Sequence, residues 1–236
     1  FIVVGGPCAY NSEPLADFVD VVILGEGEEV NLEVVNEYKE WKKNKTTRED
    51  FLYKISSIEG VYIPSFYDVK YNEDGTVQSV TPNREGITKN PTKRIIKDVE
   101  TVDYPEKLIV PYIDTVHDRI VLELFRGCTR GCRFCQAGMI YRPIREKSVK
   151  RLKEILDKLV KNTGYDEISL SSLSTSDYSK LSELTDYLVD EYASNNIGIS
   201  LPSLRLDNFS MEIADKIQQV RKSGLTFAPE AGTQRL

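Results

Sequence analysis

The segment Leu124-Phe-Arg-Gly-Cys-Thr-Arg-Gly-Cys-Arg-Phe-Cys135 contains three of the four cysteines of this 236-residue chain. Cys128, Cys132 and Cys135 follow the spacing C-x3-C-x2-C. Thiolates clustered in this way, in a chain with so few cysteines, suit metal ligation better than a disulfide framework. A structural zinc site and a fully protein-ligated [4Fe–4S] cluster each use four protein ligands. The spacing therefore predicts a metal or cluster site with one coordination position left open.

The sequence around this segment alternates between strand-like and helix-like runs. A strand is expected at 120–124 before the cysteines, and further strands at 167–170, 197–201 and 225–228. Helices are expected over about 148–161, over about 178–194 and after Ser210. Four strands that alternate with helices predict right-handed βαβ units and a parallel sheet. The loops that follow the four strands should then meet at the carboxyl edge of that sheet.

The amino-terminal part predicts a different unit. Apolar runs at 1–4 and 21–24 and a helix over about 28–43 give the order strand, loop, strand, helix, which is typical of the later half of a Rossmann-like sheet. Residues 46–118 are expected to form a linker with a β-hairpin at Asp74-Gly75. The predicted domains are therefore 1–45, 46–118 and 119–236.

Composition limits the class of protein. Hydrophobic residues make up 40% and charged residues 29% of the chain, which is ordinary for a globular protein, and the net charge of −6 excludes a global basic field. No apolar run is long enough to span a membrane, and the start has no signal peptide, so we expect a cytoplasmic protein. The chain lacks an initiating Met, and too few residues follow Cys128 for six βα units of about 30 residues each. We therefore expect a fragment without a substrate site of its own.

A mononuclear zinc site is the alternative for the cysteines. The single histidine, His117, could supply the fourth ligand. It precedes the strand that leads into the cysteines, however, and should lie at the opposite end of that strand. Glycines at 127 and 131 suit a loop that wraps around a compact inorganic cluster.

A strand followed by C-x3-C-x2-C, with Phe134 before the last cysteine and an α/β pattern after it, resembles the radical S-adenosylmethionine enzymes. The resemblance implies a partial (βα) parallel barrel in which Cys128, Cys132 and Cys135 bind three irons of a [4Fe–4S] cluster. The fourth iron would bind the amino and carboxylate groups of S-adenosylmethionine. One electron would then cleave the cofactor to methionine and a 5′-deoxyadenosyl radical, which abstracts hydrogen from a substrate.

The same resemblance implies cofactor contacts in the cysteine loop and after the second strand. Phe134 matches the aromatic residue beside the adenine, with ordinary loop packing as the alternative. Ser171 and Ser172 stand where the family often has Gly-Gly-Glu. They are small and polar enough to approach the cofactor, but the glutamate is missing from this sequence.

Two later segments also resemble cofactor-binding parts of the family. Ser203 is a candidate for the ribose, and Arg205 is a candidate clamp for the carboxylate because of its planar guanidinium. A surface ion pair with Asp207 is the alternative for Arg205. Glu230, in Ala228-Pro-Glu-Ala-Gly232, is a candidate for the amino group or the ribose.

The first residues are similar to the carboxy-terminal half of the cobalamin-binding domain that precedes many radical barrels. Gly5 and Gly6 would let the backbone approach the nucleotide tail of that cofactor. The segment with the usual cobalt-coordinating histidine motif is not in this sequence. The resemblance thus implies cobalamin as a candidate cofactor beside the cluster and S-adenosylmethionine.

The expected function is radical chemistry on an unidentified substrate: methylation, thiomethylation or rearrangement. An electron donor such as flavodoxin or ferredoxin is the implied partner, and RNA is a candidate substrate. Five arginines give the cysteine loop a local positive charge that suits an acidic donor, the cluster or RNA phosphate, and an ordinary solvated loop is an equal alternative: Arg126, Arg130, Arg133, Arg142 and Arg145. The alternative function is a non-catalytic iron–sulfur or RNA-binding module.

Overall fold

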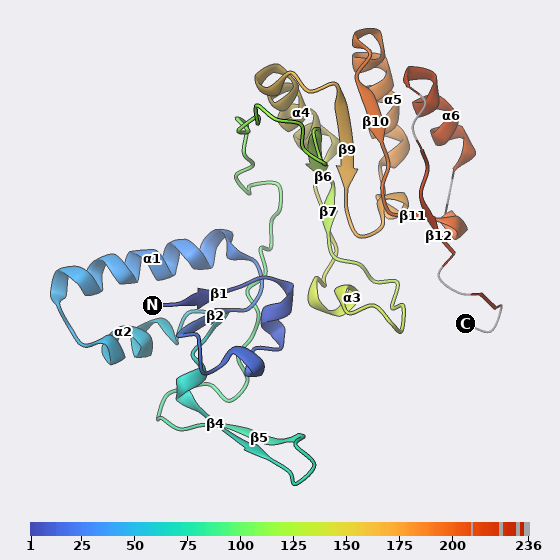
Figure 1. Ribbon diagram of the computed structural model, residues 1–236. Helices are drawn as coiled ribbons and strands as arrows, with labels where there is room; N and C mark the ends of the chain where they lie inside the picture. Colours follow the sequence, from blue (N-terminus) through green and yellow to red (C-terminus); the bar gives the residue numbers. More distant parts are fainter. Residues whose placement is uncertain (209, 222–223, 230–231, 234–236) are drawn as a thin grey trace. The chain divides into compact units, whose positions relative to one another are not determined.

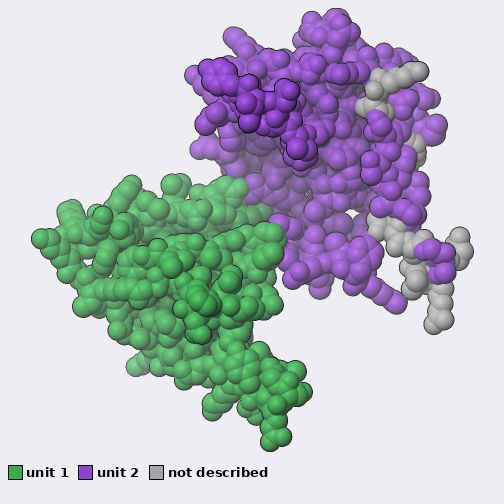
Figure 2. All heavy atoms as spheres, in the orientation of Figure 1, with its two compact units in different colours: residues 1–97 green, residues 98–236 purple. Residues whose placement is uncertain are grey.

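The protein is mixed α/β and divides into two compact units, unit 1 (Phe1–Lys97) and unit 2 (Asp98–Leu236), shown in Figures 1 and 2. The computed structural model describes all residues except 209, 222–223, 230–231 and 234–236. In the part of the chain that it describes, no helix is both long and apolar enough to cross a membrane.

Unit 1 is built on a three-stranded sheet of order β1-β2-β3. The strands β1 (Val3–Val4) and β2 (Val21–Ile23) are parallel, and β3 (Val61–Tyr62) is antiparallel to β2. Helix α1 (Gly27–Asn44) follows β2, and α2 (Arg48–Ile55) comes next. Single turns of 3-10 helix occur at Pro7–Tyr10, Glu13–Leu15 and Pro64–Phe66. Both strands and the helix expected in the first 45 residues are therefore present.

Residues 48–66 belong to the core of unit 1, which differs from the expected linker over 46–118. Thr47 starts α2 with a capping box: its hydroxyl accepts from the Asp50 N–H at 3.1 Å, and the Asp50 carboxylate accepts from the Thr47 N–H at 3.0 Å. The apolar side of α2 is buried with the sheet. The buried members of this core are Val21, Ile23, Val30, Val34, Phe51, Leu52, Ile55, Val61, Ile63, Phe66 and Tyr67. The boundary between units consequently falls after Lys97 and not at residues 45 or 118.

The hairpin expected at Asp74-Gly75 is present. β4 (Tyr67–Tyr71) and β5 (Val77–Pro82) are antiparallel, and Gly75 has a φ of 81° in the connecting turn. Arg94 forms an isolated parallel bridge with Gly25. The Arg94 guanidinium donates to Glu29 and Glu33 of α1, so side-chain ion pairs hold this segment in place of a strand ladder.

Unit 2 contains a parallel sheet of order β10-β9-β6 with helices packed on one face (Figure 1). Its strands are β6 (Ile120–Glu123), β9 (Glu167–Ser171) and β10 (Gly198–Ser200). Its helices are α3 (Ala137–Ile140), α4 (Val149–Thr163), α5 (Leu181–Tyr192) and α6 (Met211–Val220). Two short pairs accompany the sheet: β7 (Phe125–Arg126) with β8 (Arg145–Glu146), antiparallel, and β11 (Leu204–Arg205) with β12 (Phe227–Ala228), parallel.

The expected parallel sheet is confirmed for its first three strands. The fourth, β12, pairs with β11 and not with β10. The chain leaves β10 through Leu201 and Pro202, and Ser203 has a φ of 59°, which turns the backbone before β11. β10 and β11 are therefore separate strands, and the single strand expected at 197–201 ends at Ser200.

The register of β10-β9-β6 separates its two faces. On the helix face, Ile120, Ile168 and Ile199 lie side by side in register, as do Leu122 and Leu170. These side chains are buried with apolar residues of α4 and α5 in one core. On the polar face, alternate residues form two other rows, because successive strand residues point to opposite sides. Those rows are Val121, Ser169 and Ser200, and then Glu123 and Ser171.

Candidate functional site

The three clustered cysteines lie in a loop that β7 and β8 close at its base. Phe125 pairs with Glu146, and Arg126 with Arg145, so the loop leaves and returns at one place. Gly127 opens the loop with a φ of 94°, and a Cβ there would lie 2.4 Å from the Pro143 carbonyl oxygen. Only glycine fits this close approach, which explains one of the two glycines beside the cysteines.

A buried lysine and an arginine bind Glu123, the last residue of β6. Lys147 is 1% exposed, and its ammonium donates to the Glu123 carboxylate at 2.5 Å and to the Glu123 carbonyl at 3.2 Å. Arg126 donates to the same carboxylate at 3.0 Å. Burial raises the pKa of Glu123, but the bonds from Arg126 and Lys147 outweigh it and hold that pKa below the usual value. Glu123 therefore stays ionised and holds the last residue of β6 to both ends of the loop.

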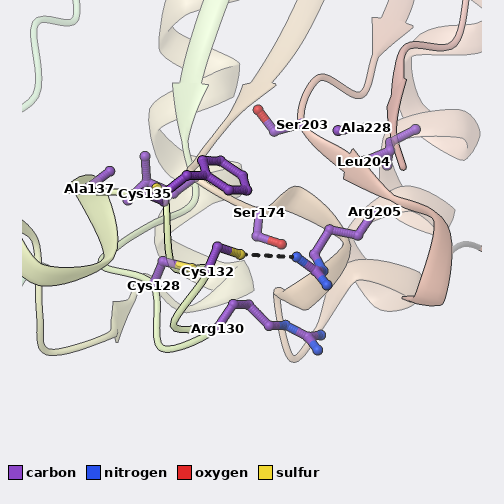
Figure 3. A pocket seen from close by; sticks show the side chains of 12 residues that line it. Cys128, Arg130, Cys132, Cys135, Ala137, Ser174, Ser203, Leu204, Arg205 and Ala228 are labelled. Carbon is purple, nitrogen blue, oxygen red and sulfur yellow. Dashed lines mark hydrogen bonds between the residues drawn. The ribbon is translucent and has the colours of Figure 1, made fainter. Parts of the chain in front are cut away.

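All three cysteines line one cavity of about 240 Å³ (Figure 3). The cysteines are free and partly exposed, and the Cys135 N–H donates to the Cys132 carbonyl at 3.0 Å. Other walls come from segments that follow β9 and β10 and from β12. The expected convergence at the carboxyl edge of the sheet is thus confirmed for the loops after the first three strands. The lining residues beyond the cysteines are Arg130, Phe134, Ala137, Leu173, Ser174, Ser203, Leu204, Arg205 and Ala228.

Phe134, Ser203 and Arg205, which the sequence singled out, lie at this cavity. The Phe134 ring is 72% exposed and presents an apolar surface to the cavity. Ser203 lies in the turn after β10, where its carbonyl accepts from the Thr175 N–H at 3.2 Å.

Ser171 and Ser172 do not line the cavity, whereas Leu173 and Ser174 do. Ser171 is still within β9, in register with Glu123, and its carbonyl accepts from the Leu124 N–H at 2.9 Å. The Ser172 hydroxyl is paired with the Thr175 hydroxyl at 3.1 Å. The cavity is therefore lined by the two residues that follow Ser172, and cofactor contacts at Ser171 and Ser172 stay a prediction.

The other sequence candidates are not part of this cavity. Glu230 lies outside the described residues. Gly5 and Gly6 belong to unit 1, at the carboxyl end of β1. Gly6 has a φ of 93° and precedes a turn of 3-10 helix, so this position requires the left-handed backbone that glycine adopts without strain.

Arg205 makes two kinds of contact at the cavity. Its Nε and Nη2 each donate to the Asp207 carboxylate at 2.9 Å, and its Nη1 donates to Cys132 Sγ at 3.8 Å. The ion pair raises the pKa of Arg205 and lowers that of Asp207. The ion pair with Asp207 is therefore present, together with a contact to a cysteine that the sequence did not indicate.

Arg130 connects the cysteine loop to Asp177, which the sequence reasoning missed. Its Nε donates to Asp177 Oδ2 at 2.7 Å, and its Nη2 donates to Oδ1. Asp177 also accepts from the Ser174 hydroxyl at 2.8 Å and the Asn208 amide at 3.1 Å. The bond from Arg130 is the main cause that lowers the pKa of Asp177 to about 2.

Two of the five arginines expected to give the loop its positive charge have acidic partners. Arg126 is matched by Glu123, and Arg130 by Asp177. The sequence did hold a signal for the two acidic residues. Asp177 and Asp207 both follow strands, where parallel-sheet proteins place functional side chains.

The zinc alternative finds no set of converging ligands among the described residues. Among the described residues, no three His, Cys, Asp or Glu side chains converge as the ligands of a single ion would. His117 contacts Arg119, with 3.2 Å between its Nδ1 and Nη2, and precedes β6 while the cysteines follow it. Three thiolates around one cavity are instead the donor set with which cysteines bind separate irons of a cluster.

Comparisons with known proteins agree with this geometry. Residues 1–64 match the family profile described as radical SAM proteins, N-terminal, and residues 122–236 match the radical SAM superfamily. An uncharacterized protein of Methanocaldococcus jannaschii is 32% identical over 237 residues, which cover 99% of this chain and 44% of that relative. The chain thus spans less than half the length of this curated relative.

Two solved structures of one enzyme share the fold. Both are of TsrM, a radical S-adenosylmethionine methyltransferase from Kitasatospora setae. The structure with cobalamin and a [4Fe–4S] cluster has a TM-score of 0.53 at 14% identity and is covered to 40%, with 92% of this chain aligned. The structure with tryptophan substrate and a S-adenosylmethionine analogue has a TM-score of 0.52 at 13% identity and is covered to 39%, again with 92% of this chain.

Proposed function

This chain belongs to the radical S-adenosylmethionine superfamily, and we propose that Cys128, Cys132 and Cys135 hold a [4Fe–4S] cluster that reductively cleaves S-adenosylmethionine. The observation that carries the proposal is the single cavity that all three cysteines line together with residues that follow β9 and β10. A cluster with three protein thiolates keeps one iron for the amino and carboxylate groups of the cofactor.

The cluster supplies one electron, and the bond between sulfur and the 5′ carbon of S-adenosylmethionine breaks to give methionine and a 5′-deoxyadenosyl radical. The residues of this chain bind S-adenosylmethionine and orient it. The exposed ring of Phe134 offers a flat apolar surface to an adenine, and the hydroxyls of Ser174 and Ser203 can bond a ribose. Glu230 stays a proposed contact for the amino group or the ribose.

We assign the two units to parts of a larger architecture. Unit 2 is the proposed beginning of a (βα) barrel, which the parallel order β10-β9-β6 supports. Unit 1 is the proposed later part of a cobalamin-binding domain, with Gly5 and Gly6 at the cofactor. The parallel pair β1-β2 and the turn at Gly6 support this assignment.

The proposed reaction on the substrate is methylation, thiomethylation or rearrangement, each beginning with the same cleavage step. Cobalamin, which the TsrM structure contains, favours methylation among the three. The free cysteines suit a reducing compartment such as the cytoplasm, where a flavodoxin or ferredoxin can donate the electron. RNA is kept as a candidate substrate.

Anaerobic reconstitution of the full-length protein tests the proposal. We expect about four irons per chain and 5′-deoxyadenosine after reduction with dithionite. Cys132→Ala should lose the cluster, whereas Cys8→Ala, a change at an exposed cysteine in unit 1, should keep it.

The alternative, a non-catalytic iron–sulfur module, predicts the same iron content without cleavage. A full-length protein that carries its cluster and forms no 5′-deoxyadenosine would establish that alternative. A normal cluster in Cys132→Ala would refute the assignment of the ligands.

A further inference from the structure

Four charged side chains of alternating sign lead from the loop after β9 to Cys132. Arg130 donates to Asp177 at 2.7 Å and to Asp207 at 3.5 Å. Asp207 accepts two bonds of 2.9 Å from Arg205, whose remaining Nη1 donates to Cys132 Sγ at 3.8 Å. Figure 3 shows Arg130 and Arg205 beside Cys132, with the bond from Arg205 drawn as a dashed line.

These side chains come from three separate segments of unit 2. Arg130 lies between two of the cysteines, Asp177 ends the 3-10 helix Thr175–Asp177, and Arg205 ends β11. Asn208 adds a bond from its amide to the Ser176 carbonyl at 2.7 Å. Asp207 therefore holds one side of the Arg205 guanidinium, and Arg130 in turn holds Asp207.

Stabilisation of the fold does not account for this arrangement. The side chains of Arg130 and Asp207 are 35% and 52% exposed, and ion pairs this open to water contribute little to folding. The arrangement instead determines the orientation of the Arg205 guanidinium. With Nε and Nη2 bonded to Asp207, the Nη1 end of the planar group lies toward Cys132.

We propose that Arg205 tunes the reduction potential of the cluster by donating a hydrogen bond to the Cys132 thiolate, and that Asp207 and Arg130 are positioning residues for it. The inference rests on the proposed function only in that Cys132 must be a cluster ligand. Hydrogen bonds to ligand sulfurs and a nearby positive charge stabilise the reduced cluster, which carries one more negative charge. Arg205 therefore makes the cluster easier to reduce.

This role differs from that of a clamp for the carboxylate of S-adenosylmethionine. A carboxylate is gripped by the two parallel N–H groups of one side of a guanidinium. In Arg205 the Nε–Nη2 side already binds Asp207 in this way. The end that faces the cavity carries Nη1, which donates to Cys132 Sγ at 3.8 Å.

The test is the reduction potential of the reconstituted full-length protein, measured by anaerobic spectroelectrochemistry without S-adenosylmethionine. In Arg205→Gln we expect an unchanged iron content and an about tenfold lower ratio of reduced to oxidised cluster at the wild-type midpoint, which is about 59 mV for one electron. Arg205→Lys keeps the charge but not the planar group and should give a smaller shift. Asp207→Glu and Arg130→Lys keep their charges but displace the bonds that orient Arg205, so each should lower the ratio about threefold.

Arg221→Gln is the matched control, since it removes another arginine of unit 2 that pairs with Asp166 at 3.3 Å and does not line the cavity. Its potential should equal that of the wild type. An unchanged potential in Arg205→Gln overturns the proposal, and an unchanged potential with weaker binding of S-adenosylmethionine assigns Arg205 as the clamp instead. Should Arg205→Gln fail to hold a cluster, Asp207→Glu decides, because an unchanged potential there also overturns the proposal. Failure of the proposed function would appear separately, as missing 5′-deoxyadenosine in a wild type whose potential still responds to Arg205.

Discussion

The helix face and the polar face of the β10-β9-β6 sheet are built from alternate residues of the same strands. On the helix face, Ile120, Leu122, Ile168 and Leu170 are 0% exposed and pack against α4 and α5. On the polar face the corresponding rows carry Val121, Glu123 and three serines. One strand can thus serve two purposes, because residues two apart share a face. Burial on the helix face supplies stability, while the polar face leads up to the loops that form the cavity.

Leu170→Ala should give the largest effect, because it removes a fully buried side chain from the helix face. We expect a loss of about 2–5 kcal/mol in the free energy of unfolding, from lost burial and the cavity left behind. Ser200→Ala, on the polar face of the neighbouring strand, should change it by less than about 0.5 kcal/mol. Urea denaturation of the full-length apoprotein measures both. Equal losses in the two variants would abolish the proposed division of labour between the faces.

Gly127→Ala tests the passage from the strands into the cysteine loop. A Cβ at this residue meets the Pro143 and Tyr141 carbonyl oxygens at 2.4 Å and 2.8 Å, and the φ of 94° is strained for alanine. We expect a loss of about 1–3 kcal/mol and reduced iron loading after reconstitution. Gly131→Ala is the control, since Gly131 has a φ of 71° but only Thr129 O near it, at 4.0 Å. If Gly131→Ala loses as much iron as Gly127→Ala, the close approach to Pro143 is not the reason.

Ser148→Ala should weaken the main helix of the helix face without touching its apolar contacts. The Ser148 hydroxyl caps α4 by accepting from the Arg151 N–H at 3.1 Å. Loss of such a cap costs about 1 kcal/mol. Ser210→Ala removes the longer cap of α6, where the Ile213 N–H lies 3.4 Å from the hydroxyl, and should cost less. The midpoints of urea unfolding of the two variants measure these costs. A larger loss of stability in Ser210→Ala than in Ser148→Ala would contradict the expected order.

Asp177→Asn should have the smallest effect, a loss of stability at neutral pH that disappears in acid. Because the folded state holds the pKa of Asp177 at about 2, below the ordinary 3.8, its ionisation stabilises the fold at neutral pH. This contribution is fully present above the ordinary pKa and is lost as the pH falls through the folded-state value. Unfolding of the apoprotein between about pH 4 and pH 2 should therefore depend less steeply on pH in Asp177→Asn than in the wild type. Parallel curves would show that Arg130 does not hold this carboxylate in solution.

Local patterns in the sequence were sufficient for parts of both units. The stripe of α4, the hairpin at Asp74-Gly75 and the cysteine spacing each depend on residues close together in the chain, so periodicity and turn chemistry could predict them. The position of α2 in the core of unit 1 was missed although its capping box is visible from Thr47 and Asp50. A cap signals a helix start but not what the helix packs against.

The charged pairs at the cavity could not be predicted in the same way. Arg130 and Asp177 are 47 residues apart, and Cys132 and Arg205 are 73 apart. Nothing in the spacing of such residues indicates that they meet. They meet because parallel strands bring their carboxyl ends to one edge of a sheet, and the exact length of β9 then selects Ser174 over Ser171 and Ser172.

The residue types and spacing of the cysteine segment were enough to indicate three thiolate ligands and an open coordination position, since those follow from covalent order and ligand chemistry. Only the tertiary structure placed Arg205 on Cys132, Asp177 on Arg130 and residues 48–66 in the core of unit 1. The physical reason is that ligand identity is a property of single side chains. Hydrogen bonds and buried contacts between distant segments depend instead on where the whole sheet brings its strand ends together.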